Sequence, residues 1–292
     1  MNIWFERFDR HHFFDWVPDA LYLRMRFKQR CGRSLNLAEP KTFNEKLQWL
    51  KLYNRKPEYT VMVDKYKVRE YIAQMIGEEY LIPLLGVWDD PEDIDFDALP
   101  NRFVLKCNHN SGLGMCICKD KSKLDITKVK AELRKGLQQN YYLSSREWPY
   151  KDVPRKIIAE KYMEDASGDL KDYKFYCFNG EMKFVMINSD RNTSKPTRAD
   201  YFDRDFNWLD FTWGYSHAEV HPQKPEQFEK MVAIAEKLAK GLPHIRVDLY
   251  DCNGKIYFGE LTFFDGSGFD KIEPEEWDYK IGNMLELPPQ KV

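Results

Sequence analysis

The sequence predicts an α+β protein with antiparallel sheets. Segments typical of strands and segments typical of helices are mixed along the 292 residues and do not alternate strictly. Asn-Gly pairs at 179–180 and 253–254 are each flanked by two strand-like segments, which is the sequence signature of a β-hairpin. The hairpins make the pairing of these strands antiparallel.

The N-terminal half is expected to begin with helices and to continue with a pair of strands. Residues 1–60 are expected to be helical and irregular, with Thr42 and Glu45 forming a capping signal that opens an amphipathic helix. A second helix is expected over 62–76, beginning near Asp64 and Lys65. The elements expected after it are an extended segment over 80–88, a strand over 103–107, a glycine-containing loop over 108–114 and a return strand over 115–119.

The rest of the chain is expected to contain two hairpins and two helices. A helix is expected over 126–140. The connector over 149–154 has a proline at each end and is expected to mark a boundary between two lobes. The elements expected after it are a strand over 156–163, a hairpin with strands over 173–177 and 182–187, a helix over 225–240 and a last hairpin with strands over 244–250 and 255–262. The expected domains are a helical N-terminal segment (1–60), a smaller lobe (61–155) and a larger lobe (156–292).

Composition narrows the class of protein. The formal net charge of −2 lacks the basic surplus of a nucleic-acid-binding domain, so no nucleic-acid partner is expected. The six cysteines form no C-x-x-C pair, which favours reduced thiols in a cytoplasmic protein. No apolar stretch is long enough for a membrane span or a signal peptide. Residues 1–30 are expected to pack as a helix on the body of the protein, with an interfacial amphipathic segment as the alternative.

The last hairpin carries the strongest chemical signal. Asp248 and Glu260 each lie among apolar residues of a strand, where an ionised carboxylate is costly unless it is paired or binds a cation. Two converging carboxylates form a hard-oxygen site for Mg²⁺, which in such sites usually also holds substrate phosphates. Arg246 lies two residues before Asp248 and therefore points to the same face, where it is suited to a phosphoryl or acyl-phosphate oxygen.

The register of this hairpin decides whether its two acids meet. A two-residue Asn-Gly turn pairs Cys252 with Lys255 and leaves the two acids on opposite faces. A three-residue loop, or one bulge at Gly254, sets Asp248 directly across from Glu260. The magnesium hypothesis therefore requires a bulged hairpin, and the alternative is a surface hairpin with two solvated acids.

Lysines and a glycine loop suggest phosphate binding elsewhere in the chain. Lys106 ends a strand just before the turn Ser111-Gly112-Leu113-Gly114, whose backbone N–H groups are free of side-chain obstruction. A plain hairpin explains the same loop without a ligand. Lys65 and Lys174 are further candidate cations, and each is equally explained as a solvated lysine.

A nucleotide base has a candidate position after the strand over 156–163. Glu160 lies near the end of this apolar strand and leads to Tyr162 and Met163, where backbone groups and apolar side chains suit a base. Asp172 is placed to accept a hydrogen bond from a ribose hydroxyl.

The order of these pieces is more specific than any one of them. It runs DK (64–65), LK (105–106) with the SGLG loop, IAEKY (158–162), DYKF (172–175), RVD (246–248) and ELT (260–262). This series resembles the ATP-grasp superfamily over about residues 60–270. The whole chain resembles its teichuronopeptide-biosynthesis (TupA-like) branch, and the segments that carry this resemblance are PKTFNEKLQWLK (40–51), DKYKVR (64–69), EYLIPLLG (79–86) and FVLKCNH (103–109).

The resemblance implies an ATP-grasp fold in which two α+β lobes hold ATP between them, and it implies roles for particular residues. Arg246 would stabilise an acyl phosphate and Lys174 would act beside it. His109 is a candidate general base for an attacking amine, with a loop-ordering hydrogen bond as the alternative. The implied ATP-binding residues are Lys65, Lys106, Ser111, Gly112, Gly114, Glu160, Lys161, Tyr162, Met163 and Asp172.

The implied magnesium ligands are Asp248, Glu260 and Thr262. Thr262 stands where the superfamily often has a metal-ligating Asn, so the number of Mg²⁺ ions is open, and Asp265 is a candidate replacement ligand. Loop residues are candidates for the acceptor site, with ordinary surface positions as the alternative, and an arginine among them is suited to hold a sugar carboxylate bidentately. These candidates are Asn108, Arg191, Arg198, Asp265 and Ser267.

The superfamily chemistry implied by the resemblance is ATP-dependent activation of a carboxylate as an acyl phosphate, followed by attack of an amine and release of ADP and phosphate. The branch implies a uronic-acid amide, or an amino acid added to a bacterial surface polysaccharide, with peripheral association to membrane polysaccharide machinery as a further expectation. The alternatives are a glycosyltransferase, an ATP-dependent sugar kinase and a non-catalytic module. No D-x-D motif ends a strand in the first half, and Asp203-Arg204-Asp205 lies late in the chain.

Overall fold

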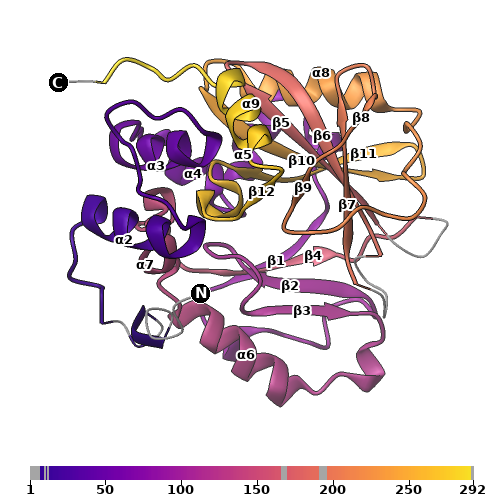
Figure 1. Ribbon diagram of the computed structural model, residues 1–292. Helices are drawn as coiled ribbons and strands as arrows, with labels where there is room; N and C mark the ends of the chain where they lie inside the picture. The colour runs from indigo at the N-terminus through magenta and orange to yellow at the C-terminus, as the bar shows by residue number, and fades with distance from the viewer. Residues whose placement is uncertain (1–6, 10, 12, 166–169, 191–195, 291–292) are drawn as a thin grey trace.

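The computed structural model describes residues 7–9, 11, 13–165, 170–190 and 196–290, and two antiparallel sheets with surrounding helices dominate them (Figure 1). This arrangement confirms the predicted α+β class. No helix among the described residues has both the length and the hydropathy needed to cross a lipid bilayer.

The smaller sheet has the strand order β1-β4-β2-β3. Its strands are Leu84–Trp88 (β1), Phe103–Cys107 (β2), Met115–Cys118 (β3) and Ile157–Lys161 (β4). Helix α6 (Ile126–Gln138) covers one face, below the sheet in Figure 1, where Val129 and Leu133 pack with Leu105. A short helix, α7 (Tyr141–Ser145), follows α6.

The larger sheet has the strand order β11-β10-β5-β6-β7-β8. Its strands are Lys171–Phe178 (β5), Glu181–Ser189 (β6), Arg198–Asp203 (β7), Trp208–Leu209 (β8), His244–Cys252 (β10) and Lys255–Thr262 (β11). Helix α8 (Phe228–Ala239) packs on β5, β6 and β10 through its apolar side (Figure 1). A separate ribbon pairs β9 (Thr212–Trp213) with β12 (Ile272–Glu273).

The N-terminal helices lie beside both sheets in Figure 1. They are α2 (Asp19–Cys31), α3 (Phe43–Tyr53), α4 (Glu58–Val63) and α5 (Val68–Met75), and the C-terminal α9 (Glu276–Met284) packs on α3. The predicted capping box is confirmed, since Thr42 Oγ1 accepts from the Glu45 N–H and Glu45 Oε2 accepts from the Thr42 N–H. These helices share one buried core with the larger sheet. Single 3₁₀ turns lie at Glu78–Tyr80, Pro91–Asp93, Lys121–Lys123 and Trp148–Tyr150, and a turn with positive φ values lies at Asp265–Gly268.

Two expected boundaries differ from the structure. The helix expected over 62–76 is interrupted between α4 and α5, because the Asp64 carboxylate accepts hydrogen bonds from the backbone N–H groups of Tyr66 and Lys67. The strand placed at the start of the larger lobe, β4, belongs instead to the smaller sheet, where it pairs with β1 and β2. Its buried Ile157 and Ala159 complete the core of that sheet, so the chain enters the larger sheet only after residue 161.

The last hairpin brings Asp248 opposite Glu260, but by a different route from the one expected. The turn has two residues, Asn253 and Gly254, both with positive φ, and Cys252 pairs with Lys255. The bulge lies further along the strand, because Leu249 pairs with Phe258 while Asp248 pairs with Glu260, which leaves Gly259 as the extra residue. The expected bulge at Gly254 is therefore wrong in position. The extra residue at 259 nevertheless brings the side chains of Asp248 and Glu260 to the same face of the sheet, as a bulge at Gly254 would.

Substitution of Gly259 by Ala is expected to lower the free energy of unfolding by about 1–2 kcal/mol. A Cβ at this position would lie 3.0 Å from the Tyr250 ring and 3.1 Å from the carbonyl oxygen of Asp248, and the carbonyl belongs to the paired strand. Urea denaturation of the wild type and the variant measures the loss. An unchanged midpoint would show that the bulge accommodates a methyl group.

Candidate active site

The centre of the candidate site is the buried guanidinium of Arg246 on β10. Its Nε and Nη2 donate to the two oxygens of Asp248 at 2.7 and 2.8 Å. Nη2 also lies 2.9 Å from Glu260 Oε1, and Nη1 contacts Asp265. Burial opposes the charge of Arg246, but the surrounding carboxylates outweigh it and raise the pKa of Arg246 well above its ordinary value. Arg246 therefore remains a cation that three carboxylates orient.

Three charged side chains form a row across neighbouring strands of the larger sheet. Lys174 on β5 pairs with Asp248 on β10, which pairs in turn with Glu260 on β11. Lys174 Nζ lies 2.6 Å from Asp248 Oδ2 and 2.5 Å from Asp172 Oδ2. Burial disfavours the ammonium, but these two carboxylates outweigh it and raise the pKa of Lys174. The row thus sets one cation on β5 beside two carboxylates on β10 and β11.

Glu260 lies where four cations converge. Burial disfavours ionisation of its carboxyl group, but the cations outweigh burial and lower its pKa to about 2. These cations are Lys65, Arg246, Lys174 and Lys106. The Glu260 side chain is 36% exposed, and its Oε2 lies 4.0 Å from Lys65 Nζ, too far for a hydrogen bond. Basic side chains gathered at an accessible carboxylate have the chemistry to bind phosphate oxygens.

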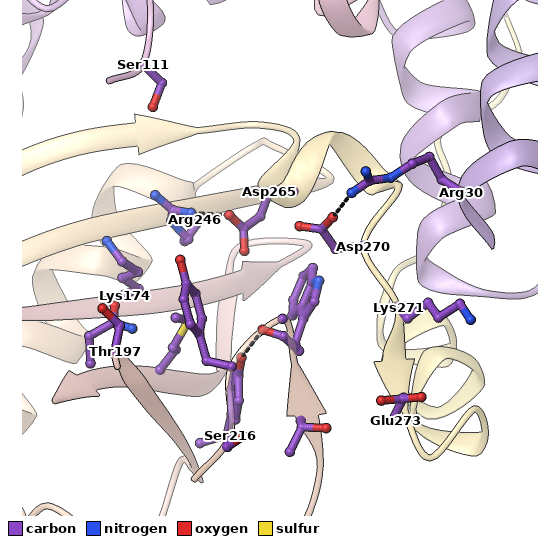
Figure 2. Close-up of a pocket in the computed structure, with 18 of the residues that line it drawn as sticks. Arg30, Ser111, Lys174, Thr197, Ser216, Arg246, Asp265, Asp270, Lys271 and Glu273 are labelled. Atoms are coloured by element: carbon purple, nitrogen blue, oxygen red, sulfur yellow. Dashed lines mark hydrogen bonds and ion pairs between the residues drawn. The ribbon is translucent and has the colours of Figure 1, made fainter. Parts of the chain in front are cut away.

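The loop after β2 is bonded to Lys65. Lys65 Nζ donates to the carbonyl oxygen of Asn110 at 2.6 Å. Gly112 and Gly114 adopt positive φ of +82° and +69°, and a Cβ at Gly114 would lie 2.8 Å from the Cα of Gly136 on α6. The loop therefore needs glycine at 114 to pack on α6. Figure 2 shows the Ser111 side chain projecting from this loop toward the side on which Arg246 lies.

A cavity of about 530 Å³ lies between the two sheets. The smaller sheet contributes Val104 and Ile117, and Tyr250 of β10 contributes from the larger sheet. Lys106 also lines this cavity, and its Nζ lies 2.7 Å from Glu160 Oε2. An apolar cavity with a cation at its edge has the chemistry to take a base together with a phosphate. The predicted base-binding residues Lys161, Tyr162 and Met163 all line it.

A second cavity, of about 820 Å³, opens on the other side of the cation cluster. Lys174, Arg246 and Glu260 line one end, and Figure 2 shows Asp265 beside Arg246 there. Aromatic and hydroxyl side chains supply much of the remaining wall: Thr197, Tyr201, Thr212, Trp213, Tyr215 and Ser216. Aromatic faces and hydroxyl groups together suit a polyhydroxylated molecule.

The residues present fit Mg²⁺ if phosphate oxygens complete its coordination. No group of three or more His, Cys, Asp or Glu side chains in the described parts of the chain is placed to hold a metal ion by itself. Mg²⁺ typically takes only one or two carboxylates together with phosphates and water. Glu260 offers an accessible carboxylate, with the Thr262 hydroxyl 3.4 Å from its Oε1. Asp248 has both oxygens in ion pairs, so a metal would share it with Lys174 and Arg246.

The structure corrects two predicted substrate contacts. Asn108 is fully buried, donates to Asp64 and Pro154, and accepts from the Lys156 N–H, so its amide group joins the loop to the neighbouring segments. The Ser267 hydroxyl donates to Glu147 at 2.5 Å and lines neither cavity. In both cases a buried polar group is already satisfied within the protein, so it is not presented to a ligand.

Other predicted residues are placed as follows. His109 is buried, its Nε2 lies 3.2 Å from the carbonyl oxygen of Gln139, and burial lowers its pKa to about 4. This geometry favours the loop-ordering hydrogen bond over a general base. Asp172 Oδ2 lies 2.5 Å from Lys174 Nζ. Arg198 begins β7 directly after the cavity residue Thr197, and Arg191 lies outside the described residues.

Sequence reasoning missed residues that only packing brings to the site. Arg30 reaches the larger cavity from α2 and pairs with Asp270 at 2.9 Å (Figure 2). Nothing in the sequence around Arg30 marks it for this role. Arg69 contacts Glu160 at 3.4 Å, and its place in the DKYKVR segment was the one available signal.

The comparisons with known proteins give one family and several distant likenesses. The family model described as TupA-like ATPgrasp matches residues 45–286. The chain is 28% identical over 99 residues to a lipoteichoic acid synthase of Staphylococcus saprophyticus, a match that covers 33% of this chain and 14% of that protein.

Among solved structures, the chain is similar to the D-alanine–D-alanine ligases of Bacillus anthracis and Helicobacter pylori. The first, determined with ATP, is 19% identical with a TM-score of 0.41, over 70% of this chain and 54% of that one. The second is 13% identical with a TM-score of 0.45, over 85% of this chain and 70% of that one. The chain therefore spans about half the length of the Bacillus ligase.

Proposed function

Because the chain belongs to the TupA-like ATP-grasp family, we propose that it is an ATP- and Mg²⁺-dependent carboxylate–amine ligase. It activates a carboxylate as an acyl phosphate, which an amine then attacks, and it releases ADP and phosphate. The observation that carries this proposal is the cluster of cations around Glu260, which lies between an apolar cavity and a larger polar one.

ATP binds across the first cavity and the cation cluster. Adenine lies against Tyr162 and Met163, and the phosphates extend past Lys106 toward Lys65 and Lys174. Glu260 and Asp248 would hold Mg²⁺, which would supply positive charge to neutralise the phosphates. Arg246 points at the place where the terminal phosphate meets the acceptor and stabilises the charge of the acyl phosphate.

The acceptor carboxylate binds in the 820 Å³ cavity, next to Arg246. Tyr215, which is 46% exposed, offers an aromatic surface to a sugar ring, and the hydroxyl side chains that line the cavity beside it offer hydrogen bonds. We therefore take the acceptor to be a uronic acid of a bacterial surface polysaccharide, and the amine to be a small amine or an amino acid. Consumption of ATP places this reaction in the cytoplasm, with peripheral association to the membrane machinery if the glycan is lipid-linked.

The test is incubation of the protein with ATP, Mg²⁺ and a panel of hexuronic acids and amines, with ADP and product mass as readouts. Hydroxylamine in place of the amine is expected to trap the acyl phosphate as a hydroxamate. A sugar kinase would instead yield a phosphorylated sugar and no hydroxamate. Turnover of a nucleotide-sugar without ATP consumption would replace the ligase proposal with a glycosyltransferase.

Lys106→Met is expected to weaken binding of a non-hydrolysable ATP analogue about tenfold. The substitution keeps an unbranched side chain of nearly the same length but removes a cation that pairs with Glu160 and acts on Glu260, next to the proposed phosphate position. Calorimetry with the analogue measures the change, and Lys123→Met, at an 82% exposed side chain, is the matched control. Equal affinity of wild type and Lys106→Met would refute the phosphate assignment of Lys106.

A further inference from the structure

The turn Asp265–Gly268 lies between the larger cavity and the N-terminal helices. Gly266, Ser267 and Gly268 all have positive φ, at +53°, +53° and +63°. Ser267 lacks the conformational freedom of glycine, so this backbone must be held by the contacts around it. Asp265, at the start of the turn, contacts both Arg246 and Tyr176.

Two side chains of α3 hold the carbonyl groups of this turn. Gln48 Nε2 donates to the carbonyl oxygens of Ser267 at 3.0 Å and Gly268 at 2.7 Å. Lys51 Nζ donates to the carbonyl oxygen of Ser267 at 2.7 Å and to that of Ser145 at 2.9 Å. Gln48 and Lys51 are both 0% exposed, so water does not compete for these carbonyl groups.

A buried carboxylate completes the network. Glu147 Oε1 accepts from the hydroxyls of Ser267 at 2.5 Å and Ser145 at 3.0 Å. A buried ammonium and a buried carboxylate are both costly and are kept only where their hydrogen bonds are satisfied. Gln48, Lys51 and Glu147 line neither cavity, so contact with a ligand does not explain them.

The N-terminal helices also hold the segment just after the turn. Asn44 Nδ2 of α3 donates to the carbonyl oxygen of Asp270 at 2.9 Å. Arg30 of α2 pairs with the Asp270 carboxylate (Figure 2). Two helices from the start of the chain therefore hold residues 265–270, which carry one of the carboxylates on Arg246.

We propose that Gln48, Lys51 and Glu147 are positioning residues that hold the Asp265–Gly268 turn so that Asp265 keeps Arg246 directed into the acceptor cavity. This inference rests on the proposed function in one respect, namely that Arg246 acts on the acyl phosphate. The N-terminal helix α3 then helps to position the catalytic apparatus.

The test uses two variants of the network and a matched control. Lys51→Met alone leaves the Glu147 charge buried without its cation, so the first variant is Lys51→Met/Glu147→Gln, in which both charges are removed. The second is Gln48→Leu, which removes both hydrogen bonds of the Gln48 amide to the turn. The control is Lys46→Met, on the same helix, where Nζ donates to the carbonyl oxygens of Gly282 at 2.8 Å and Leu285 at 2.7 Å, away from the turn.

Two expected results support the proposal. Amide hydrogen exchange of a peptide covering 264–270 rises about tenfold in both network variants and stays unchanged in Lys46→Met. The kcat of hydroxamate formation falls roughly 10- to 100-fold in the network variants, while affinity for the ATP analogue is unchanged, because the network does not touch Lys65, Lys106 or the smaller cavity.

Unchanged exchange at the turn overturns the proposal, and so does a loosened turn with unchanged kcat. If the wild type forms no hydroxamate with any carboxylate, the proposed function fails separately. Hydrogen exchange then still tests how the turn is held, and a crystal structure of Lys51→Met/Glu147→Gln in which Asp265 remains on Arg246 overturns the inference by itself.

Discussion

Glu260→Gln is expected to lower the kcat of Mg²⁺-dependent ADP release by roughly 10²- to 10³-fold while the fold stays intact. The carboxylate is ionised, since the cations around it lower its pKa to about 2, and its side chain is 36% exposed. Glutamine keeps the shape and an oxygen for Arg246 but loses the charge that balances the cations and binds a metal. Steady-state kinetics over a MgCl₂ series, together with thermal melting, measures both parts of the prediction.

The control for this change is Glu181→Gln, at the exposed end of β6, where the carboxylate pairs with Lys183 on the surface. It removes the same charge from the same sheet and is expected to leave turnover unchanged. If Glu260→Gln keeps full activity and the same Mg²⁺ dependence, the metal assignment of Glu260 is wrong.

Asp248→Asn is expected to lower the free energy of unfolding by about 3 kcal/mol, because it removes the anionic partner of buried ion pairs and leaves the cations in place. Asp248 is 2% exposed and holds Lys174 and Arg246 together. The amide group leaves both cations buried with less compensating charge. Urea denaturation measures the loss, and turnover is expected to fall as well because Arg246 loses one of its orienting carboxylates.

Asp251→Asn, near the end of the same strand, is the matched control. Its side chain accepts a hydrogen bond from the Gly254 N–H at 2.8 Å. The amide oxygen of an asparagine can accept the same bond, so little change in the free energy of unfolding is expected. A loss below about 1 kcal/mol in Asp248→Asn would mean that the remaining carboxylates on Lys174 and Arg246 are sufficient for the folded state.

The two substitutions separate two roles for paired acids. The accessible Glu260 is expected to matter for turnover more than for stability, and the buried Asp248 is expected to matter for both. The sequence alone treats the two as equivalent, because each is a carboxylate between apolar residues of a strand. Their difference arises because folding buries Asp248 and leaves Glu260 36% exposed.

The sequence by itself determined the fold class, the main elements and the family. Alternation of apolar residues, Asn-Gly turns and the Thr42 capping box act within a few residues of one another, so they can be recognised without tertiary contacts. The ordered motifs likewise identified the family, which the match over residues 45–286 confirms. These motifs also placed Lys106, Arg246 and Glu260 on elements that the structure brings to one site.

Only the tertiary structure decided where the hairpin bulges and which polar side chains are already engaged. The bulge lies at Gly259 rather than Gly254, since a shift at either place aligns the acids and the local sequence does not choose between them. Asn108 and Ser267 were predicted to bind substrate, but they are satisfied by Lys156 and Glu147. The partner of a buried polar group comes from segments distant in sequence, so neither its identity nor the contribution of the N-terminal helices to the site can be recognised before the chain is folded.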